Sequence, residues 1–199
     1  MLVFGKWNTQ DVKCNDLGLA KYMGFQEKEI PHTFGVSKST PTGKAKKSVV
    51  ERLVNKLMRS GQGKKKLSGK YLRGRNGCGK KELMLKSVDE AFDYIYKVTK
   101  ENPIQILVRA IENSAPREDT IRIKKGGVMH TQAVDVAPIK RLDEALKNIS
   151  LAVFSKTYGT KIGISKALAE ELIAAAKNDP KSYALKRKDE IERIAMGSR

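Results

Sequence analysis

The stretch Gly74–Lys81 comes closest, in residue types and spacing, to a catalytic motif. It reads GRNGCGKK and fits the first seven positions of the nucleotide-binding P-loop, a glycine-rich turn that cradles phosphates. The last position of that motif is a Ser or Thr whose hydroxyl holds Mg²⁺, but here it is Lys81. The preceding residues, 64–73, are too basic for the buried strand that a P-loop follows. We interpret the stretch as a basic loop. An NTPase is the alternative, to be tested by nucleotide binding with and without Mg²⁺.

Other residues that could act in catalysis or hold a metal are few. His32 and His130 are the only histidines, and His130 has no neighbouring Ser or Cys pattern typical of an activated nucleophile. Two cysteines, Cys14 and Cys78, are too few for a structural zinc site with four ligands. For the acidic pair 118–119, local ion pairing at the foot of a hairpin is favoured over a metal site. The sequence therefore predicts no catalytic residue, no metal and no cofactor.

The balance of charge points to a polyanionic partner. The 199 residues include 40 Lys and Arg against 22 Asp and Glu, a formal net charge of +18. Such an excess concentrates polyanions at the surface, and every phosphate that is neutralised releases a counterion. A basic membrane-surface protein is the rival class, but it needs an amphipathic helix or a lipidation signal. No apolar run approaches the roughly 20 residues of a spanning helix. We expect a nucleic-acid partner, a reduced intracellular setting and no membrane.

The elements that position these charges are mostly helical. Apolar residues recur at helical spacing in six segments, and Asn102–Pro103 supplies an N-cap followed by a proline at the first helical position. At Ile121–Lys124 the period becomes two, as in a strand, and Gly126–Gly127 suits a tight turn. This pattern predicts a mainly α fold, a bundle of about six helices with one protruding β-hairpin at about 119–137. The helices are expected after Ser48, at about 84–101, from Pro103, from Pro138, and at about 164–177 and 181–196.

Two segments do not have the pattern of a core element. The lack of such a pattern in residues 1–45 predicts an extended basic N-terminal arm, which precedes a helical domain at 46–199. The aromatics of the arm either anchor it to a partner or fold back onto the core; they are Phe4, Trp7, Tyr22 and Phe25. Residues 62–82, rich in Gly, Lys and Arg, predict a long basic loop that is mobile in the free protein.

Three basic clusters exceed what a solvated helix face requires. Lys44, Lys46 and Lys47 precede the first helix, where the helix dipole alone would favour acids. Lys124–Lys125 adjoin two glycines, which let a backbone approach closely. Lys186–Lys188 form the third cluster, but consecutive residues fan around a helix and neighbouring acids offset them. These positions fit contacts to phosphates.

Several blocks in the right order resemble the small-subunit ribosomal protein seven family. The blocks are Asn102–Ile111, Asn113–Thr120 and Gln132–Val136 with Pro138 and Arg141. Ser182–Ala184, Lys188–Glu190 and Glu192–Arg193 are similar to the closing helix of its eukaryotic cytosolic and archaeal branch, in which the eukaryotic member is also called protein five. Phe4–Trp7 resembles the eukaryotic arm. The resemblance spans nearly the whole chain.

This resemblance implies a structural protein of the small ribosomal subunit. It would bind a junction in the 3′ major (head) domain of the rRNA, nucleate head assembly, and hold its hairpin near the exit-site tRNA and the departing mRNA. Neighbouring proteins would include the platform protein eleven. The chain would work in the cytoplasm, with nucleolar assembly in a eukaryote, and take no small-molecule substrate. An RNA-binding protein or chaperone outside the ribosome is the alternative.

The resemblance and the charges together give the predicted contact residues. For rRNA these are Lys44, Lys46, Lys47, Arg52, Lys56, Lys64, Lys65, Lys80, Lys81, Arg117, Lys140 and Arg141. For the exit-site tRNA and mRNA they are Arg122, Lys124, Lys125, Gly126, Gly127 and Arg199.

Overall fold

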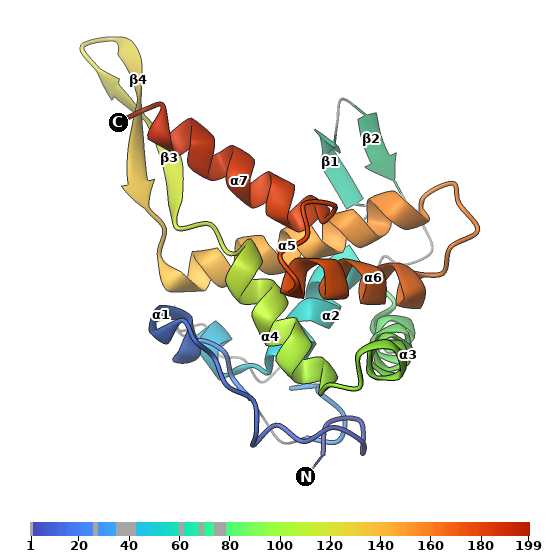
Figure 1. Ribbon diagram of the computed structural model, residues 1–199. Coiled ribbons are helices and arrows are strands. Elements are labelled where there is room, and N and C mark those ends of the chain that lie inside the picture. The colour runs from blue at the N-terminus through green and yellow to red at the C-terminus, as the bar shows by residue number, and fades with distance from the viewer. Residues whose placement is uncertain (1, 26–27, 35–42, 60–61, 68–69, 74–78) are drawn as a thin grey trace.

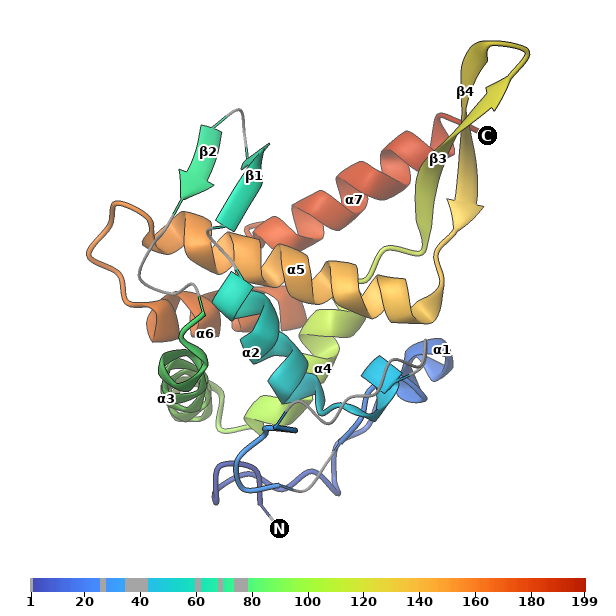
Figure 2. The same cartoon turned by 180° about the vertical axis from the view of Figure 1, so that it is seen from behind.

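The structure is a computed structural model that describes residues 2–25, 28–34, 43–59, 62–67, 70–73 and 79–199. For residues 62–67, 70–73 and 125 it describes only the backbone. A helical body carries the β-hairpin β3–β4 at one end with the C-terminus beside it, and the N-terminus lies at the opposite end (Figures 1 and 2). The elements are α1 Leu17–Ala20, a 3₁₀ helix η1 Gly43–Lys46, α2 Val49–Arg59, β1 Gln62–Leu67, β2 Lys70–Arg73, α3 Lys81–Thr99, α4 Pro103–Ser114, β3 Glu118–Lys125, β4 Val128–Asp135, α5 Pro138–Thr157, α6 Ile164–Ala176 and α7 Tyr183–Met196.

Helix α6 lies at the centre of the body. Small and apolar residues cover most of its surface, so α3, α4, α5 and α7 can all pack against it. Ala167, Leu168, Leu172 and Ala175 are completely buried. Burial of about 25 cal/mol per Å² of apolar surface at this centre gives the main stabilising term of the fold. The prediction of a mainly α fold with a protruding hairpin is confirmed.

Local signals fix the starts of α4 and α5 where the sequence predicts them. The Asn102 side chain accepts a hydrogen bond from the Ile104 amide at 3.0 Å, with Pro103 at the first helical position of α4. Ser182 caps α7 in the same way, accepting from the Leu185 amide. Pro138 opens α5. Helix α3 begins at Lys81, three residues before the predicted start.

The hairpin β3–β4 has its turn at the predicted position. It pairs Glu118 with Asp135 at its base and Lys125 with Val128 at its tip. Gly126 and Gly127 both have positive φ, 56° and 86°, as a two-residue primed turn requires. Most of its described side chains are exposed, and only the base packs against α7. The hairpin therefore adds little to the core and is free to meet a partner.

A second hairpin replaces most of the predicted loop at 62–82. Strands β1 and β2 pair antiparallel, with Gln62 opposite Arg73 and Leu67 opposite Lys70. The sequence gives no apolar alternation there, so the usual strand signal is missing. The prediction of an unstructured loop was wrong for these ten strand residues.

The described part of the N-terminal segment packs on the body. Val3 is buried, the Phe4 ring meets Phe92 edge-on at 6.1 Å, and the Trp7 ring lies 5.2 Å from that of Tyr96. These aromatics fold back onto the core, which is one of the two alternatives that the sequence leaves open. Whether residues 1–45 form a separate unit stays a prediction.

Gly24 joins this segment to the start of α2. Its carbonyl accepts from the Val49 amide at 3.0 Å. A Cβ at residue 24 would lie 2.7 Å from the carbonyl oxygen of Lys47, so only glycine fits without displacing backbone. The contact holds the basic residues of η1 close to α2.

Candidate nucleic-acid interface

Three cations from two elements share one carboxylate on α5. The Lys44 Nζ lies 3.4 Å from Oδ2 of Asp143, and Arg52 and Lys56 approach Oδ1 at 3.2 and 3.5 Å. Lys44 belongs to η1, and the other two belong to α2. One negative charge therefore holds three positive charges at the place where α2 crosses α5 (Figure 2).

Burial and charge act in opposite directions on this cluster. Burial alone would raise the pKa of Asp143, but the charges of Lys56 and Arg52 outweigh it and the net shift is downward. Burial lowers the pKa of Lys56 more than the carboxylate of Asp143 raises it. Asp143 thus stays ionised, and because three cations share this one carboxylate the cluster keeps a positive charge that favours a further anion.

A pocket opens beside this cluster, between α2 and α5. It has a volume of about 210 Å³ and is lined by Lys56, Arg59, Lys147, Ser150 and Leu151. Arg59 is exposed, and no acidic side chain in the described part of the chain contacts it. Lys147 is half-exposed and pairs with Glu144 at 2.7 Å.

We group as the α2–α5 surface the basic residues that line the pocket or pair with Asp143 and remain accessible, together with the two lysines within three residues of Lys44. The group consists of Lys44, Lys46, Lys47, Lys56, Arg59 and Lys147. The sequence predicts the first four as rRNA contacts and misses Arg59 and Lys147. Spacing along one helix could not have found these two, because the pocket exists only where α2 and α5 meet.

Arg52 has a different place from the predicted one. The sequence predicts it as an rRNA contact, but its side chain is only 5% exposed. Besides Asp143, it donates to the carbonyl of Tyr22 at 3.1 Å. Its guanidinium holds the N-terminal segment, α2 and α5 together, so the α2–α5 surface omits it.

The other predicted rRNA residues are spread over the molecule. Arg141 is 12% exposed and pairs with Asp16 at 2.8 Å, and Lys140 pairs with Asp119 at 2.8 Å. This second ion pair agrees with the local pairing expected for Asp119. Arg117 is exposed, while the side chains of Lys64 and Lys65 lie outside the described residues.

The P-loop-like stretch enters α3 without forming a nucleotide site in its described part. Residues 74–78 lie outside the description. Lys80 is exposed, and Lys81 pairs at 2.8 Å with Glu51, whose side chain is only 2% exposed. Glu51 also accepts from the amide and hydroxyl of Thr33. Lys81 therefore occupies the position where the motif needs a hydroxyl, and its side chain forms an ion pair within the fold.

The hairpin presents two chemically different faces. Arg122 and Lys124 lie on one face, where they pair with Thr131 and Met129 of the other strand. The other face carries Ile121 and Ile123 opposite Gln132 and His130. The Lys125 side chain lies outside the description. Arg199 forms an ion pair with Glu118, so the structure joins the C-terminal residue to the base of the hairpin and not to its tip.

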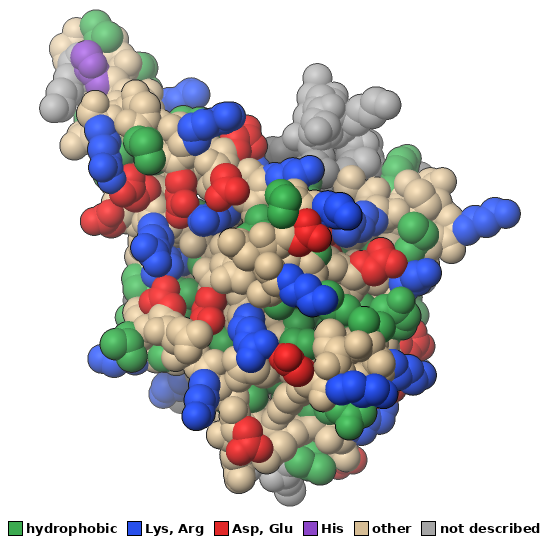
Figure 3. All heavy atoms as spheres, viewed as in Figure 1, with side chains coloured by type: hydrophobic (Ala, Val, Ile, Leu, Met, Phe, Trp, Pro, Cys, Tyr) green, Lys and Arg blue, Asp and Glu red, His purple; other side chains and the backbone are tan. Residues whose placement is uncertain are grey.

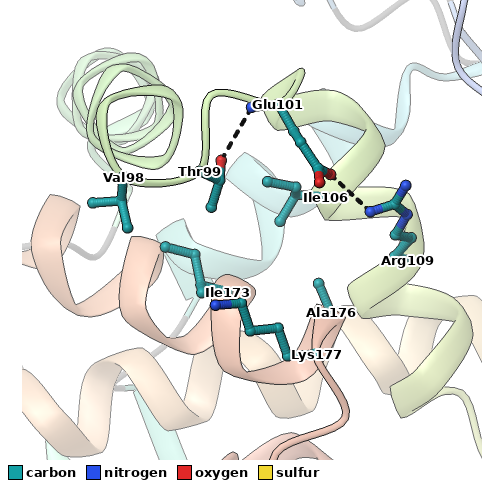
Figure 4. Close-up of a pocket in the computed structure, with 8 residues that line it drawn as sticks. All are labelled: Val98, Thr99, Glu101, Ile106, Arg109, Ile173, Ala176 and Lys177. Atoms are coloured by element: carbon teal, nitrogen blue, oxygen red, sulfur yellow. Dashed lines mark hydrogen bonds and ion pairs between the residues drawn. The ribbon is translucent and has the colours of Figure 1, made fainter.

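The face formed by α4, α6 and α7 is mixed in charge. Figure 3 shows Lys and Arg interspersed with Asp and Glu there. Between α3, α4 and α6 lies a pocket of about 300 Å³, with Ile106 and Ile173 among its lining residues and the Glu101–Arg109 ion pair on one side (Figure 4). Among the described residues, no three His, Cys, Asp or Glu side chains are grouped so as to hold a metal, and no helix is long and apolar enough to cross a membrane.

The chain matches a protein-family model over most of its length. Residues 26–199 match the family model described as "Ribosomal protein S7p/S5e". The matched range contains α2 to α7, both hairpins and the whole α2–α5 surface.

Proposed function

Because the chain belongs to the family of ribosomal protein S7p/S5e, structural proteins of the small ribosomal subunit that bind rRNA, we propose that the α2–α5 surface is the face that holds the rRNA. The family is not one of enzymes, so the NTPase alternative is set aside. The observation that carries the proposal is the sharing of Asp143 by Lys44, Arg52 and Lys56, next to the exposed Arg59.

The mechanism is one of positioning without bond making or breaking. Lys and Arg bind phosphates through charge-assisted hydrogen bonds, which fix the orientation of a protein on RNA but read no sequence. Specificity then comes from the shape of the folded RNA, its 2′-hydroxyls and its unpaired bases. Asp143 contributes by holding Lys44 and Lys56 in place, so less side-chain entropy is lost when RNA arrives.

The wider role that we propose follows the resemblance noted in the sequence. The surface binds a multi-helix junction of the 3′ major domain and nucleates assembly of the head. The hairpin lies near the exit-site tRNA and the departing mRNA, and neighbouring proteins include the platform protein eleven. Assembly takes place in the nucleolus if the source is eukaryotic, and the assembled subunit works in the cytoplasm. The exposure of the hairpin and the basic residues of one of its faces support this placement.

Neutralising the approach to α2 tests the rRNA face. In the triple variant Lys44→Gln, Lys46→Gln, Lys47→Gln, we expect affinity for an isolated head-junction RNA to fall about tenfold to hundredfold, because phosphate contacts are lost. Fluorescence anisotropy of labelled RNA measures it. The matched control is Lys161→Gln, Lys166→Gln, Lys177→Gln, which removes the same charge from exposed positions at or beside α6. Equal losses in both variants would contradict a localised face.

Shortening the hairpin tests the division of labour between body and hairpin. Deletion of Lys124, Lys125, Val128 and Met129 removes two cross-strand pairs and leaves Gly126–Gly127 as the turn on the Ile123–His130 pair. We expect normal entry into small subunits, because these residues add nothing to the core, but weaker exit-site tRNA binding or more frameshifting. Sucrose-gradient profiles and a frameshift reporter measure the two effects. Thr131→Ser, which changes an exposed hairpin residue without shortening the hairpin, is the control. Failure of the shortened protein to enter subunits would disprove the division.

A further inference from the structure

The pocket between α2 and α5 has a lining that a bare phosphate does not satisfy. Lys56, Arg59 and Lys147 supply positive charge on its sides. Ser150, which also lines it, is 2% exposed, and its hydroxyl donates to the Leu146 carbonyl at 2.7 Å. A hydroxyl has one proton, so Ser150 is left with only lone pairs to offer. An ionised phosphate also only accepts, and the Ser150 oxygen would repel it.

The charges around the pocket nevertheless favour an anion. Lys56, Arg59 and Lys147 line it, while Asp143 pairs with Lys56 and Glu144 pairs with Lys147. Three positive charges against two negative ones leave a net charge of +1. The pocket therefore suits a ligand that combines an anionic group with a hydrogen-bond donor.

The volume of the pocket limits the size of the ligand. A volume of about 210 Å³ is smaller than the sites of roughly 300–1,000 Å³ that enclose drug-sized ligands. It has room for one sugar-phosphate unit and not for a stretch of duplex. The half-buried Leu151 offers an apolar wall on the α5 side. RNA has the required combination in each nucleotide, because its 2′-hydroxyl can donate while the adjacent phosphate carries the charge.

We propose that this pocket takes one ribonucleotide of the bound RNA, with its phosphate on Lys56, Arg59 and Lys147 and its 2′-hydroxyl donating to the Ser150 oxygen. The proposal rests on the rRNA-binding function above and deepens it. DNA lacks the donor, so the pocket makes α2 and α5 selective for RNA. The hydrogen bond between Ser150 and Leu146 sets this selectivity, because it fixes the serine as an acceptor.

Deoxynucleotide interference on the head-junction RNA tests the ribose contact. RNA with sparse 2′-deoxy positions is bound to the full-length protein, and bound and free pools are compared. Among the positions that interfere, we expect one that depends on Ser150, at which a single deoxy substitution weakens binding about threefold to tenfold, as for the loss of one hydrogen bond. With Ser150→Ala that position should become silent, while all others persist. Ser155→Ala, an exposed serine on the same helix, should leave the pattern unchanged.

Each other result overturns the proposal. If Ser150→Ala keeps every interfering position, the ribose does not bond to Ser150. If Ser150→Ala weakens binding without silencing any interfering position, the group that donates to the Ser150 oxygen lies on a base and not on a ribose. The double variant Arg59→Gln, Lys147→Gln should lower affinity about tenfold or more, while the control Lys166→Gln, Lys177→Gln should not. Equal affinity of the two double variants would show that no phosphate binds in the pocket. Absence of binding by the unsubstituted protein would instead refute the proposed function, and thermal unfolding verifies that each variant is folded.

Discussion

We expect the affinity of this protein for the head-junction RNA to fall by about 10³-fold or more between 50 mM and 200 mM monovalent salt. A protein that makes about 6–10 phosphate contacts releases that many counterions, and the logarithm of its affinity then falls linearly with the logarithm of the salt concentration. The α2–α5 surface supplies six cations, and the net charge of +18 adds a general attraction for a polyanion. Anisotropy titrations at fixed Mg²⁺ and increasing KCl give the slope.

The same titration separates local contacts from the general field of the protein. Each phosphate contact that is lost should lower the magnitude of the slope by about one. The triple variant at residues 44, 46 and 47 should therefore have a shallower slope, whereas the control at residues 161, 166 and 177 should keep the original one. A flat response of the unsubstituted protein would mean that phosphates do not dominate the interaction.

Glu171→Ala should lower the free energy of unfolding by about 2–4 kcal/mol, the largest stability loss that we expect from one polar side chain. Glu171 is completely buried on α6. One of its oxygens accepts from the Ser182 hydroxyl at 2.7 Å and the Ala184 amide at 3.1 Å, and the other pairs with Lys156 at 2.7 Å. The carboxylate thus holds the start of α7 and the end of α5 together, and alanine would leave these donors unpaired.

Urea unfolding followed by circular dichroism measures this loss. Glu170→Ala is the matched control, because its side chain is exposed on the same helix and its removal should change stability by less than about 0.5 kcal/mol. Similar midpoints for the two variants would show that Glu171 contributes little. The exposed end of Lys156 can reach water after the substitution, which keeps the expected loss below that of a fully buried pair.

Much of the fold follows from local patterns. The Asn102 cap, the prolines at residues 103 and 138, and the two glycines of the hairpin act within a few residues of their own position, so the sequence shows their effect directly. Strands β1 and β2 lack such signals. Their pairing depends on backbone hydrogen bonds in a segment dominated by Gly and Lys, and no apolar period announces it.

The candidate site was less predictable because its parts come from distant segments. Positive charge before α2 is visible in the sequence, and it indicates a phosphate-binding region. The sequence cannot show that Asp143, 91 residues after Arg52, withdraws that guanidinium into the body. Nor can it show that Arg59 and Lys147 meet across a pocket. In both cases the information lies in the packing of α2 against α5.

The cluster of Lys44, Arg52 and Lys56 around one carboxylate also affects the stability of the protein outside the ribosome. In a protein without bound RNA, the positive charges of Lys44, Arg52 and Lys56 lie close together and repel one another. This repulsion weakens the packing of α2 against α5. Bound RNA relieves the repulsion and stabilises the folded chain by mass action. We therefore expect copies without RNA to open more often than RNA-bound copies and to be cleaved faster by proteases.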